Sequence, residues 1–384
     1  MNHRALFPAL ANKSYFNYGG QGPMPQTGIE AIMRSHLKMQ ELGPFGNRVI
    51  PWMNEQTDLL RNAIASHIHT TPETITLTEN VTVGCNIAMW GIDWKPGDRL
   101  LLTDCEHHAV IAIGRTLERR FGIEVATCPI LNASNPVDAI AQYLTPNTRL
   151  VVVSHILWNT GQVLELENIS QVCHQNHTLL LVDGAQSFGS MPLDMNQLKV
   201  DFYAFTGHKW MCGAAGLGGL YVALEAKDKL LPTFVGWRSV TTDTRGDIKN
   251  FQPDGRSYEI ATSNYALFAG LKVAMDIHEQ WGNIELRYEQ ILNNSKYLWE
   301  KLQKISKIQC LLSSPPKSGL VSFQLTNPEP GSSQKLVNYL ESQGIFTRTI
   351  ANPDCIRACV HYFTLESEID QLVEGISQEL GVRN

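Results

Sequence analysis

Short apolar runs that end in polar residues constrain the fold of this chain more than any other feature. They alternate with amphipathic stretches, which is the order expected of a parallel sheet covered by helices on both faces. Strands are predicted at 99–103, 124–127, 150–154, 179–182, 201–205 and 217–222, and helices at 82–90, 108–121, 137–144 and 166–176. We therefore expect an α/β fold with a mostly parallel central sheet.

The chain is long enough for more than one core. Its 384 residues exceed the roughly 250–300 at which single cores stop growing. A polar, glycine-containing stretch at 238–254 is predicted to be a loop or lid. Beyond it, helices are predicted at 265–280, 283–305, 333–343 and 367–380, and strands at 320–325 and 355–361. We predict a large α/β domain at 15–255 and a small α+β domain at 256–384, with residues 1–14 packing on the small domain.

Composition and charge argue against several classes of function. The net charge of −6 comes from 31 basic and 37 acidic residues without a basic tract, so nucleic acid is not an expected partner. No apolar stretch is long enough to cross a bilayer, and the first residues lack a signal-peptide pattern, so we expect a cytoplasmic protein without a membrane partner. The 8 cysteines are scattered, without the spacing of a zinc site. Free thiols and no metal are expected.

Polar groups follow the ends of several predicted strands, at 104–108, 155–159, 183–186 and 206–209. Ligands of open parallel sheets bind outside the carboxyl ends of the strands. These segments are therefore expected to converge on one site, although they are far apart in the sequence.

Lys209 and Asp183 are the most informative members of this set. Alone, Asp183 could cap a turn and Lys209 could be a solvated surface lysine. Together, after strands that look adjacent, they provide what pyridoxal 5'-phosphate (PLP) requires. The lysine supplies an amine for an imine bond, and the aspartate can keep the pyridine nitrogen protonated. The sequence therefore predicts a PLP site and chemistry on an amino acid.

The phosphate of such a cofactor needs a site with hydrogen-bond donors. Val81 and Thr82 begin a predicted helix, whose free N–H groups and dipole favour an anion. An ordinary helix cap is the alternative at this position. The glycine-rich segment 213–218 resembles a dinucleotide loop, but it precedes a strand instead of opening a helix. This order argues against a nicotinamide cofactor.

Four motifs together resemble one known family. They are Thr206–Lys209 (Thr-Gly-His-Lys), Val182–Gln186 (Val-Asp-Gly-Ala-Gln), Glu106–His108 (Glu-His-His) and Trp158–Gly161 (Trp-Asn-Thr-Gly). The set resembles the cysteine desulfurase-like (NifS-like) branch of the fold type I, class V aminotransferases, and within it the cyanobacterial cysteine/cystine C–S lyase type. The resemblance runs from the segment 15–20 to the strand that holds Arg357, which is nearly the whole chain.

The resemblance implies roles for the matching residues. Lys209 would carry PLP, Asp183 would pair with the pyridine nitrogen and His107 would stack on the ring, and these three form the expected catalytic set. Gln186 would bind the ring oxygen. The phosphate would be held by Val81, Thr82, Thr206 and His208, with Thr262 reaching in from the other subunit of a homodimer. The substrate would be held by Gly20, Asn159 and Arg357, the last through a two-pronged contact with the carboxylate.

Two of these residues have alternative interpretations. His107 could simply begin a helix, and Arg357 could form a salt bridge at the rim of the site. Strand alternation places Arg357 on one face with Cys355, Cys359 and His361, which favours a directed role.

The chain departs from persulfide-forming desulfurases, which carry a nucleophilic cysteine on a flexible loop ahead of the carboxylate-binding arginine. The corresponding segment, 346–354, is short and contains no cysteine, and Cys355 belongs to the same predicted strand as Arg357. Cys212, near Lys209, is better explained as a packed residue. The expected reaction is therefore elimination directed by PLP, without an enzyme thiol.

The predicted function is β-elimination on L-cystine, L-cysteine or both, giving pyruvate, ammonia and cysteine persulfide or sulfide. A persulfide leaves more readily than a thiolate, so cystine is the expected better substrate. Arg348 could bind its second carboxylate or be a surface arginine, and Trp237 and Arg238 are candidates for the entrance of the site. An iron–sulfur assembly protein is a candidate sulfur acceptor. The alternative is a cysteine desulfurase or another enzyme of this fold, such as an epimerase or transaminase, acting on a different amino acid.

Overall fold

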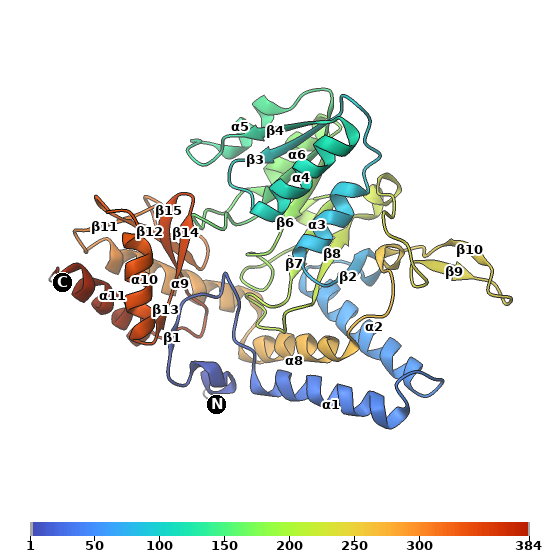
Figure 1. Cartoon of the computed structure of the whole chain (residues 1–384), viewed down its shortest axis with the longest axis horizontal. Coiled ribbons are helices and arrows are strands. Elements are labelled where there is room, and N and C mark those ends of the chain that lie inside the picture. Colours follow the sequence, from blue (N-terminus) through green and yellow to red (C-terminus); the bar gives the residue numbers. More distant parts are fainter. Residues whose placement is uncertain (1–2, 383–384) are drawn as a thin grey trace.

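A seven-stranded sheet is the centre of the computed structural model, which describes residues 3–382 (Figure 1). The strand order is β2-β8-β7-β6-β5-β3-β4. Only β8 runs antiparallel to its neighbours, so the expected α/β fold with a mostly parallel sheet is confirmed. The strands are β2 (Ile75–Thr78), β3 (Arg99–Thr103), β4 (Glu124–Cys128), β5 (Thr148–Ser154), β6 (Leu179–Asp183), β7 (Phe202–Thr206) and β8 (Gly218–Val222).

Helices cover this sheet. They are α3 (Val81–Trp90), α4 (His108–Phe121), α5 (Pro136–Tyr143), α6 (Leu166–Gln175) and the short α7 (Met195–Leu198). The connections β3-α4-β4 and β5-α6-β6 run in opposite directions along the sheet, so right-handed crossovers put α4 and α6 on opposite faces. Burial on both faces explains why β6 is apolar up to its last residue, Asp183.

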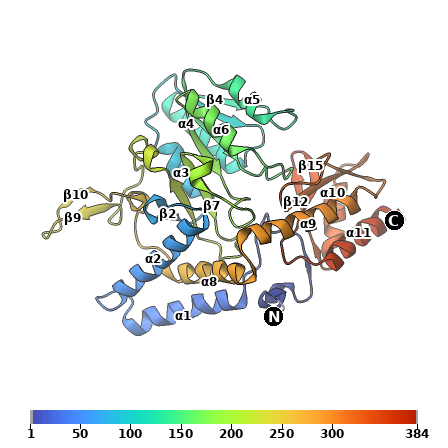
Figure 2. The same cartoon turned by 180° about the vertical axis from the view of Figure 1, so that it is seen from behind.

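Three long helices flank the large sheet. They are α1 (Gln26–Leu42), α2 (Val49–His67) and α8 (Tyr265–Trp281), and α1 lies alongside α8 in both views (Figures 1 and 2). Phe268 and Leu271 of α8 belong to the hydrophobic core of the large sheet. This helix follows the predicted domain boundary at residue 255, which stays a prediction.

A second sheet lies near the C-terminus, with strand order β11-β12-β15-β14. Its strands are β11 (Ile308–Cys310), β12 (Leu320–Leu325), β14 (Arg348–Ala351) and β15 (Asp354–Cys359), and its helices are α9 (Ile284–Leu302), α10 (Ser332–Ser342) and α11 (Glu366–Leu380). All of these elements except β14 contribute residues to a hydrophobic core that is separate from that of the large sheet.

The N-terminal segment joins this second part. The short strand β1 (Ser14–Tyr15) pairs in parallel with β13 (Ile345–Phe346). Arg4 forms an ion pair with Glu368 at 2.6 Å, and His3 Nε2 lies 2.7 Å from the hydroxyl of Tyr362. Residues 1–2, which belong to the segment predicted to pack here, lie outside the described residues.

The segment 238–254 is not the irregular loop that the sequence suggested. It contains an antiparallel hairpin of β9 (Val240–Thr242) and β10 (Ile248–Phe251), which projects away from the body of the chain (Figures 1 and 2). Every residue of β10 is exposed, so the polar composition reflects a strand without a buried face.

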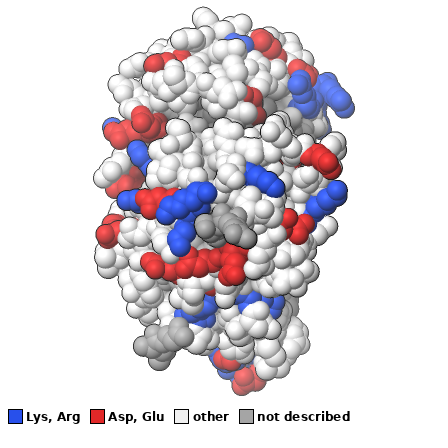
Figure 3. All heavy atoms as spheres, turned by 90° about the vertical axis from the view of Figure 1, so that its left-hand side faces the viewer, with Lys and Arg blue, Asp and Glu red and all other residues white. Residues whose placement is uncertain are grey.

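The surface carries both signs of charge. On the side that holds the four-stranded sheet β11-β12-β15-β14, here called the small sheet, basic and acidic side chains are intermixed (Figure 3). Within residues 3–382, no helix has the length and apolar character needed to span a bilayer. The same residues contain no cluster of His, Cys, Asp or Glu side chains suited to a metal ion.

Candidate active site

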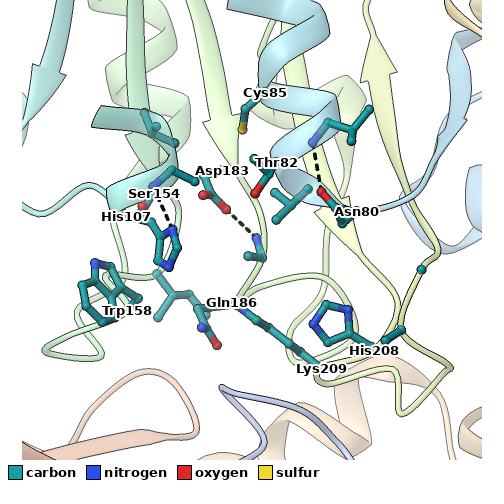
Figure 4. A pocket seen from close by; sticks show the side chains of 18 residues that line it. Asn80, Thr82, Cys85, His107, Ser154, Trp158, Asp183, Gln186, His208 and Lys209 are labelled. Carbon is teal, nitrogen blue, oxygen red and sulfur yellow. Dashed lines mark hydrogen bonds between the residues drawn. The ribbon is translucent and has the colours of Figure 1, made fainter. Parts of the chain in front are cut away.

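A cavity of about 640 Å³ lies where β3, β5, β6 and β7 end and α3 begins (Figure 4). Seven residues singled out from the sequence line it: Val81, Thr82, His107, Asp183, Gln186, His208 and Lys209. The expected convergence of separate segments at the carboxyl ends of the strands therefore occurs.

Asp183 is a buried acid at the inner end of the cavity, with 7% of its surface exposed. Its Oδ1 accepts a hydrogen bond from the backbone N–H of Ala185 at 2.9 Å. None of the ion pairs formed within residues 3–382 involves this carboxylate. A buried carboxylate without a cation is costly, so Asp183 is suited to a positively charged group of a ligand.

Lys209 follows β7, and its side chain extends toward Gln186 and Asp183 (Figure 4). Burial lowers the pKa of Lys209 to about 8, against the opposing charge of Asp183, and the positive charges of Arg357 and Arg348 lower it further. A larger fraction of this amine is therefore neutral near pH 7 than in an exposed lysine. The neutral amine is the form that attacks a carbonyl or removes a proton.

Gln186 has a fixed amide orientation. Its Oε1 accepts a hydrogen bond from the indole N–H of Trp210 at 2.9 Å, and its Nε2 donates one to the carbonyl of Gly19 at 2.9 Å. An indole nitrogen can only donate, so the amide cannot be reversed. The second N–H of Nε2 is left to donate to an oxygen of a ligand.

His107 both begins α4 and lines the cavity. Its Nδ1 accepts a hydrogen bond from the backbone N–H of Ala109 at 3.2 Å, and the ring contacts Trp158 at a centroid distance of 5.5 Å with an interplanar angle of 72°. Burial lowers the pKa of His107, with Asp183 opposing. His107 can therefore begin the helix and also stack on a cofactor ring, because the hydrogen bond from Ala109 holds its imidazole at the cavity wall.

The first turn of α3 forms the opposite wall. Asn80 caps the helix by accepting a hydrogen bond from the N–H of Val83 at 3.0 Å, which leaves the N–H groups of Val81 and Thr82 without intrahelical partners. His208 lines the cavity, and its Nδ1 lies 2.7 Å from Oγ1 of the fully buried Thr206. Burial and then the charge of Lys209 lower the pKa of His208 to about 4.

Arg357 is 2% exposed, and its Nη1 donates a hydrogen bond to the carbonyl of Trp158 at 2.7 Å. Its buried Nε has no hydrogen-bond partner among the described residues. Arg348 pairs directly with Arg357 across β14 and β15, so both side chains lie on one face of the small sheet. Two like charges at this position favour an anionic ligand between or beside them.

Asn159 lies beside these arginines and is 3% exposed. Its Nδ2 makes a long hydrogen bond of 3.4 Å to the carbonyl of Asn352, and its buried Oδ1 has no partner within residues 3–382. Gly20 lies in the turn where its N–H donates to the carbonyl of Asn17 at 2.9 Å. Neither residue is part of the main cavity wall.

Thr262 lies apart from this cavity within the single chain. It is exposed and lines a second cavity of about 460 Å³, together with Glu79, Asn86 and Phe234. Arg238, a candidate for the entrance, is instead held by Glu259 at 2.9 Å.

All 8 cysteines are buried. Cys355 is fully buried, its Sγ lies 3.9 Å from the carbonyl of Asn159, and burial raises its pKa to about 12. At neutral pH this thiol is protonated and enclosed, so it is a poor nucleophile.

Sequence reasoning gave no role to Asn80 and Ser154, which also line the cavity. Ser154 is the last residue of β5 and is paired with Asp183 in the sheet. The strand-end rule that found Asp183 would therefore have found Ser154. Asn80 is a helix cap immediately before Val81, and cap residues are recognisable from their position.

The residues around the cavity fit PLP. The unpaired acid Asp183 suits a pyridinium nitrogen, the amine of Lys209 suits an imine bond, and the start of α3 suits a phosphate. His107 provides a flat ring at the side wall, and Gln186 provides a donor for the ring oxygen.

Comparison with known families and curated proteins gives a consistent result. The family model described as Aminotransferase class-V matches residues 22–372. A probable cysteine desulfurase from Methanothermobacter thermautotrophicus is 28% identical over 99% of this chain and 98% of its own. An isopenicillin N epimerase from Streptomyces clavuligerus is 25% identical over 98% of this chain and 96% of its own.

Two solved structures are more similar still. A complex of the cystine C–S lyase C-DES with its reaction product cysteine persulfide is 46% identical, with a TM-score of 0.94, and the match covers 97% of this chain and 99% of that one. A lysine-to-alanine mutant of C-DES, with glycine covalently linked to the PLP cofactor, is 45% identical with a TM-score of 0.95, covering 97% of this chain and 98% of that one.

Proposed function

Because the chain belongs to the class V aminotransferase family, we propose that it is a PLP-dependent C–S lyase that catalyses β-elimination on L-cystine or L-cysteine. Three features of the site carry this proposal together. Lys209 and Asp183 share a cavity that is suited to PLP, two arginines are paired beside it, and no accessible thiol is present among the 8 cysteines. The similarity to the cystine C–S lyase C-DES over nearly the full chain supports it.

When bound, PLP withdraws electrons from the Cα of an amino acid, which makes the Cα proton removable. Lys209 Nζ then takes this proton, and its lowered pKa suits that role. Asp183 would hold positive charge at the pyridine nitrogen, and the remaining N–H of Gln186 would donate a hydrogen bond to the ring oxygen. His107 forms one wall of the ring site.

Substrate binding is assigned to Arg357 and Asn159. The guanidinium of Arg357 donates a hydrogen bond to the carbonyl of Trp158, and its Nε has no partner among the described residues. It can therefore bind a carboxylate in a bidentate manner. Arg348, on the same face, is placed for a second carboxylate, which cystine has and cysteine lacks.

The balanced reaction on cystine converts one cystine and one water into pyruvate, ammonia and cysteine persulfide. A cysteine desulfurase instead transfers the sulfur to an enzyme thiol and releases alanine. The enclosed, protonated state of Cys355 favours the lyase over this alternative.

The assembled enzyme is proposed to be a cytoplasmic homodimer in which Thr262 of one subunit contributes to the phosphate site of the other. Thr262 is exposed and absent from its own main cavity, which this arrangement explains. An iron–sulfur assembly protein is the proposed acceptor of the persulfide sulfur.

Product analysis tests the function. PLP-loaded protein is incubated with cystine and, separately, with cysteine, and pyruvate, alanine and cyanide-reactive sulfur are measured. The lyase yields pyruvate and sulfane sulfur from cystine in equal amounts. Alanine without pyruvate would identify a desulfurase, and inverted substrate without either product would identify an epimerase.

A further inference from the structure

Glu106 is a second buried acid beside the cavity, and the mechanism above does not use it. It is 3% exposed and lies in the turn between β3 and α4, immediately before His107. Its Oε1 accepts hydrogen bonds from the hydroxyl of Thr103 at 2.6 Å and from the N–H of Ser154 at 3.1 Å. Its Oε2 lies 2.9 Å from the hydroxyl of Ser154.

These contacts connect Glu106 to the nitrogen side of the proposed cofactor site. Ser154 lines the cavity and is paired with Asp183 across β5 and β6. The neighbouring N–H of His155 donates to the carbonyl of Asp183 at 3.0 Å. Glu106 therefore holds Ser154 at the end of β5, and Ser154 lies next to Asp183, the residue that would face the pyridine nitrogen.

The charges around Glu106 are unfavourable for a second anion. Burial, together with the negative charge of Asp183 on β6, raises the pKa of Glu106 to about 8, against the hydrogen bonds from Thr103 and Ser154. The other titratable groups that interact with it are the thiols of Cys85 on α3 and Cys105 in its own turn. No ion pair within the described chain supplies a cation to Glu106.

We infer that Glu106 is a positioning residue that acts as a neutral carboxylic acid. Its carbonyl oxygen accepts from Thr103 and Ser154 N–H, and its O–H donates to Ser154 Oγ, so that Asp183 is the single negative charge opposite the pyridine nitrogen. The inference rests on the proposed function, because it assigns Glu106 a task only in a chain that binds PLP.

Conservative substitution tests this role. A glutamine reproduces the neutral acid, since its carbonyl accepts and its amide N–H donates at the same places. E106Q is therefore expected to keep the PLP dissociation constant within about twofold of the wild type. E106L, which removes all three contacts, is expected to raise it roughly tenfold or more. Cofactor affinity is measured by fluorescence titration, independently of turnover.

A spectroscopic readout separates positioning from general support of the fold. The pH midpoint of the visible absorbance of the lysine-bound cofactor reports the net charge near the ring. Loss of a real negative charge would lower this midpoint, so an unchanged midpoint in E106Q is expected. A fall of half a pH unit or more in E106Q would overturn the neutral-acid assignment.

Controls keep the outcomes distinct. E118Q, which changes a partly exposed acid on α4, is expected to alter neither readout. If E106L does not fold, S154A replaces it and should weaken PLP binding in the same direction. Wild-type affinity in the folded E106L or S154A variant would overturn the positioning role alone. Failure of the wild-type protein to bind PLP would instead reject the proposed function.

Discussion

At the scale of single residues, the state of Cys355 decides whether the enzyme uses a thiol of its own. Its pKa of about 12, raised by burial, keeps it protonated at neutral pH. C355A is therefore expected to retain at least about half of the wild-type rate of pyruvate formation from cystine. C173A, which removes another buried thiol on α6, is the matched control. A loss greater than about tenfold in a folded C355A protein would contradict the thiol-free route.

The two paired arginines make a prediction about substrate choice. Arg357 is expected to bind the carboxylate nearest the reacting carbon, so R357K should raise KM roughly tenfold or more for both cystine and cysteine. R348A should raise KM for cystine and leave KM for cysteine nearly unchanged, because only cystine has a second carboxylate. R245A, at the exposed tip of the hairpin, should change neither. Equal effects of R348A on both substrates would remove Arg348 from a cystine-specific role.

At the scale of elements, the turn that contains Gly22 supports the loop that follows β7 and contains Lys209. The N–H of Gly22 donates to the carbonyl of His208 at 2.8 Å, and a Cβ at this position would overlap the carbonyl of Lys209 and lie 2.8 Å from Cys212 Sγ. G22A should therefore lower both the thermal unfolding temperature and PLP binding. G46A, where a Cβ meets nothing within 4 Å, should leave both unchanged. Indistinguishable behaviour of the two variants would show that the turn does not hold the loop.

Strands and helices could be predicted from the sequence where their apolar residues are the ones that the fold buries. Six strands of the large sheet, β3 to β8, were predicted to within two residues, whereas β2 was not among the predicted strands. The strands β6 and β7 are buried along their whole length, so they stand out as short apolar runs. Helix α1 was missed because its pattern is inverted. It buries the small residues Gly28, Ala31 and Ser35, whereas Met33 and Leu37 are 61% and 68% exposed.

The site was predictable where each residue follows its own strand. Lys209 and Asp183 are of this kind, because neighbouring parallel strands bring their ends together. The alignment of Arg348 with Arg357 was not predictable, since 346–354 read as a short loop and the pairing of β14 with β15 depends on register.

At the scale of the whole molecule, buried histidines predict acid sensitivity. Burial lowers the pKa of His155 and His361 to about 3. The folded chain keeps them neutral, whereas the unfolded chain protonates them below about pH 6.5. The contribution of these two histidines to the free energy of unfolding is therefore fully present above that pH. It is lost progressively as the pH drops toward 3, and the loss is about 2 kcal/mol per histidine at pH 5. Urea denaturation at about pH 7.5 and pH 5 measures this, and equal free energies of unfolding would contradict it.

Mixed dimers test whether the subunits complete each other. K209A is expected to be inactive, and T262A is expected to need more PLP for full activity. If Thr262 serves the partner's cavity, unfolding and refolding the two variants together creates dimers with one complete site. Activity at limiting PLP should then exceed the sum of the separate variants. Simple additivity would place Thr262 outside a shared site.

The pairing of β1 with β13 has a consequence for how the chain is made. Ser14 aligns with Ile345, so β1 is synthesised long before β13, the strand with which it pairs. The turn at Gly19, which receives the hydrogen bond from Gln186, belongs to the same early segment. A growing chain can therefore form the large sheet before this segment is anchored at β13, so the contact between Gly19 and Gln186 is secured only after β13 has been made.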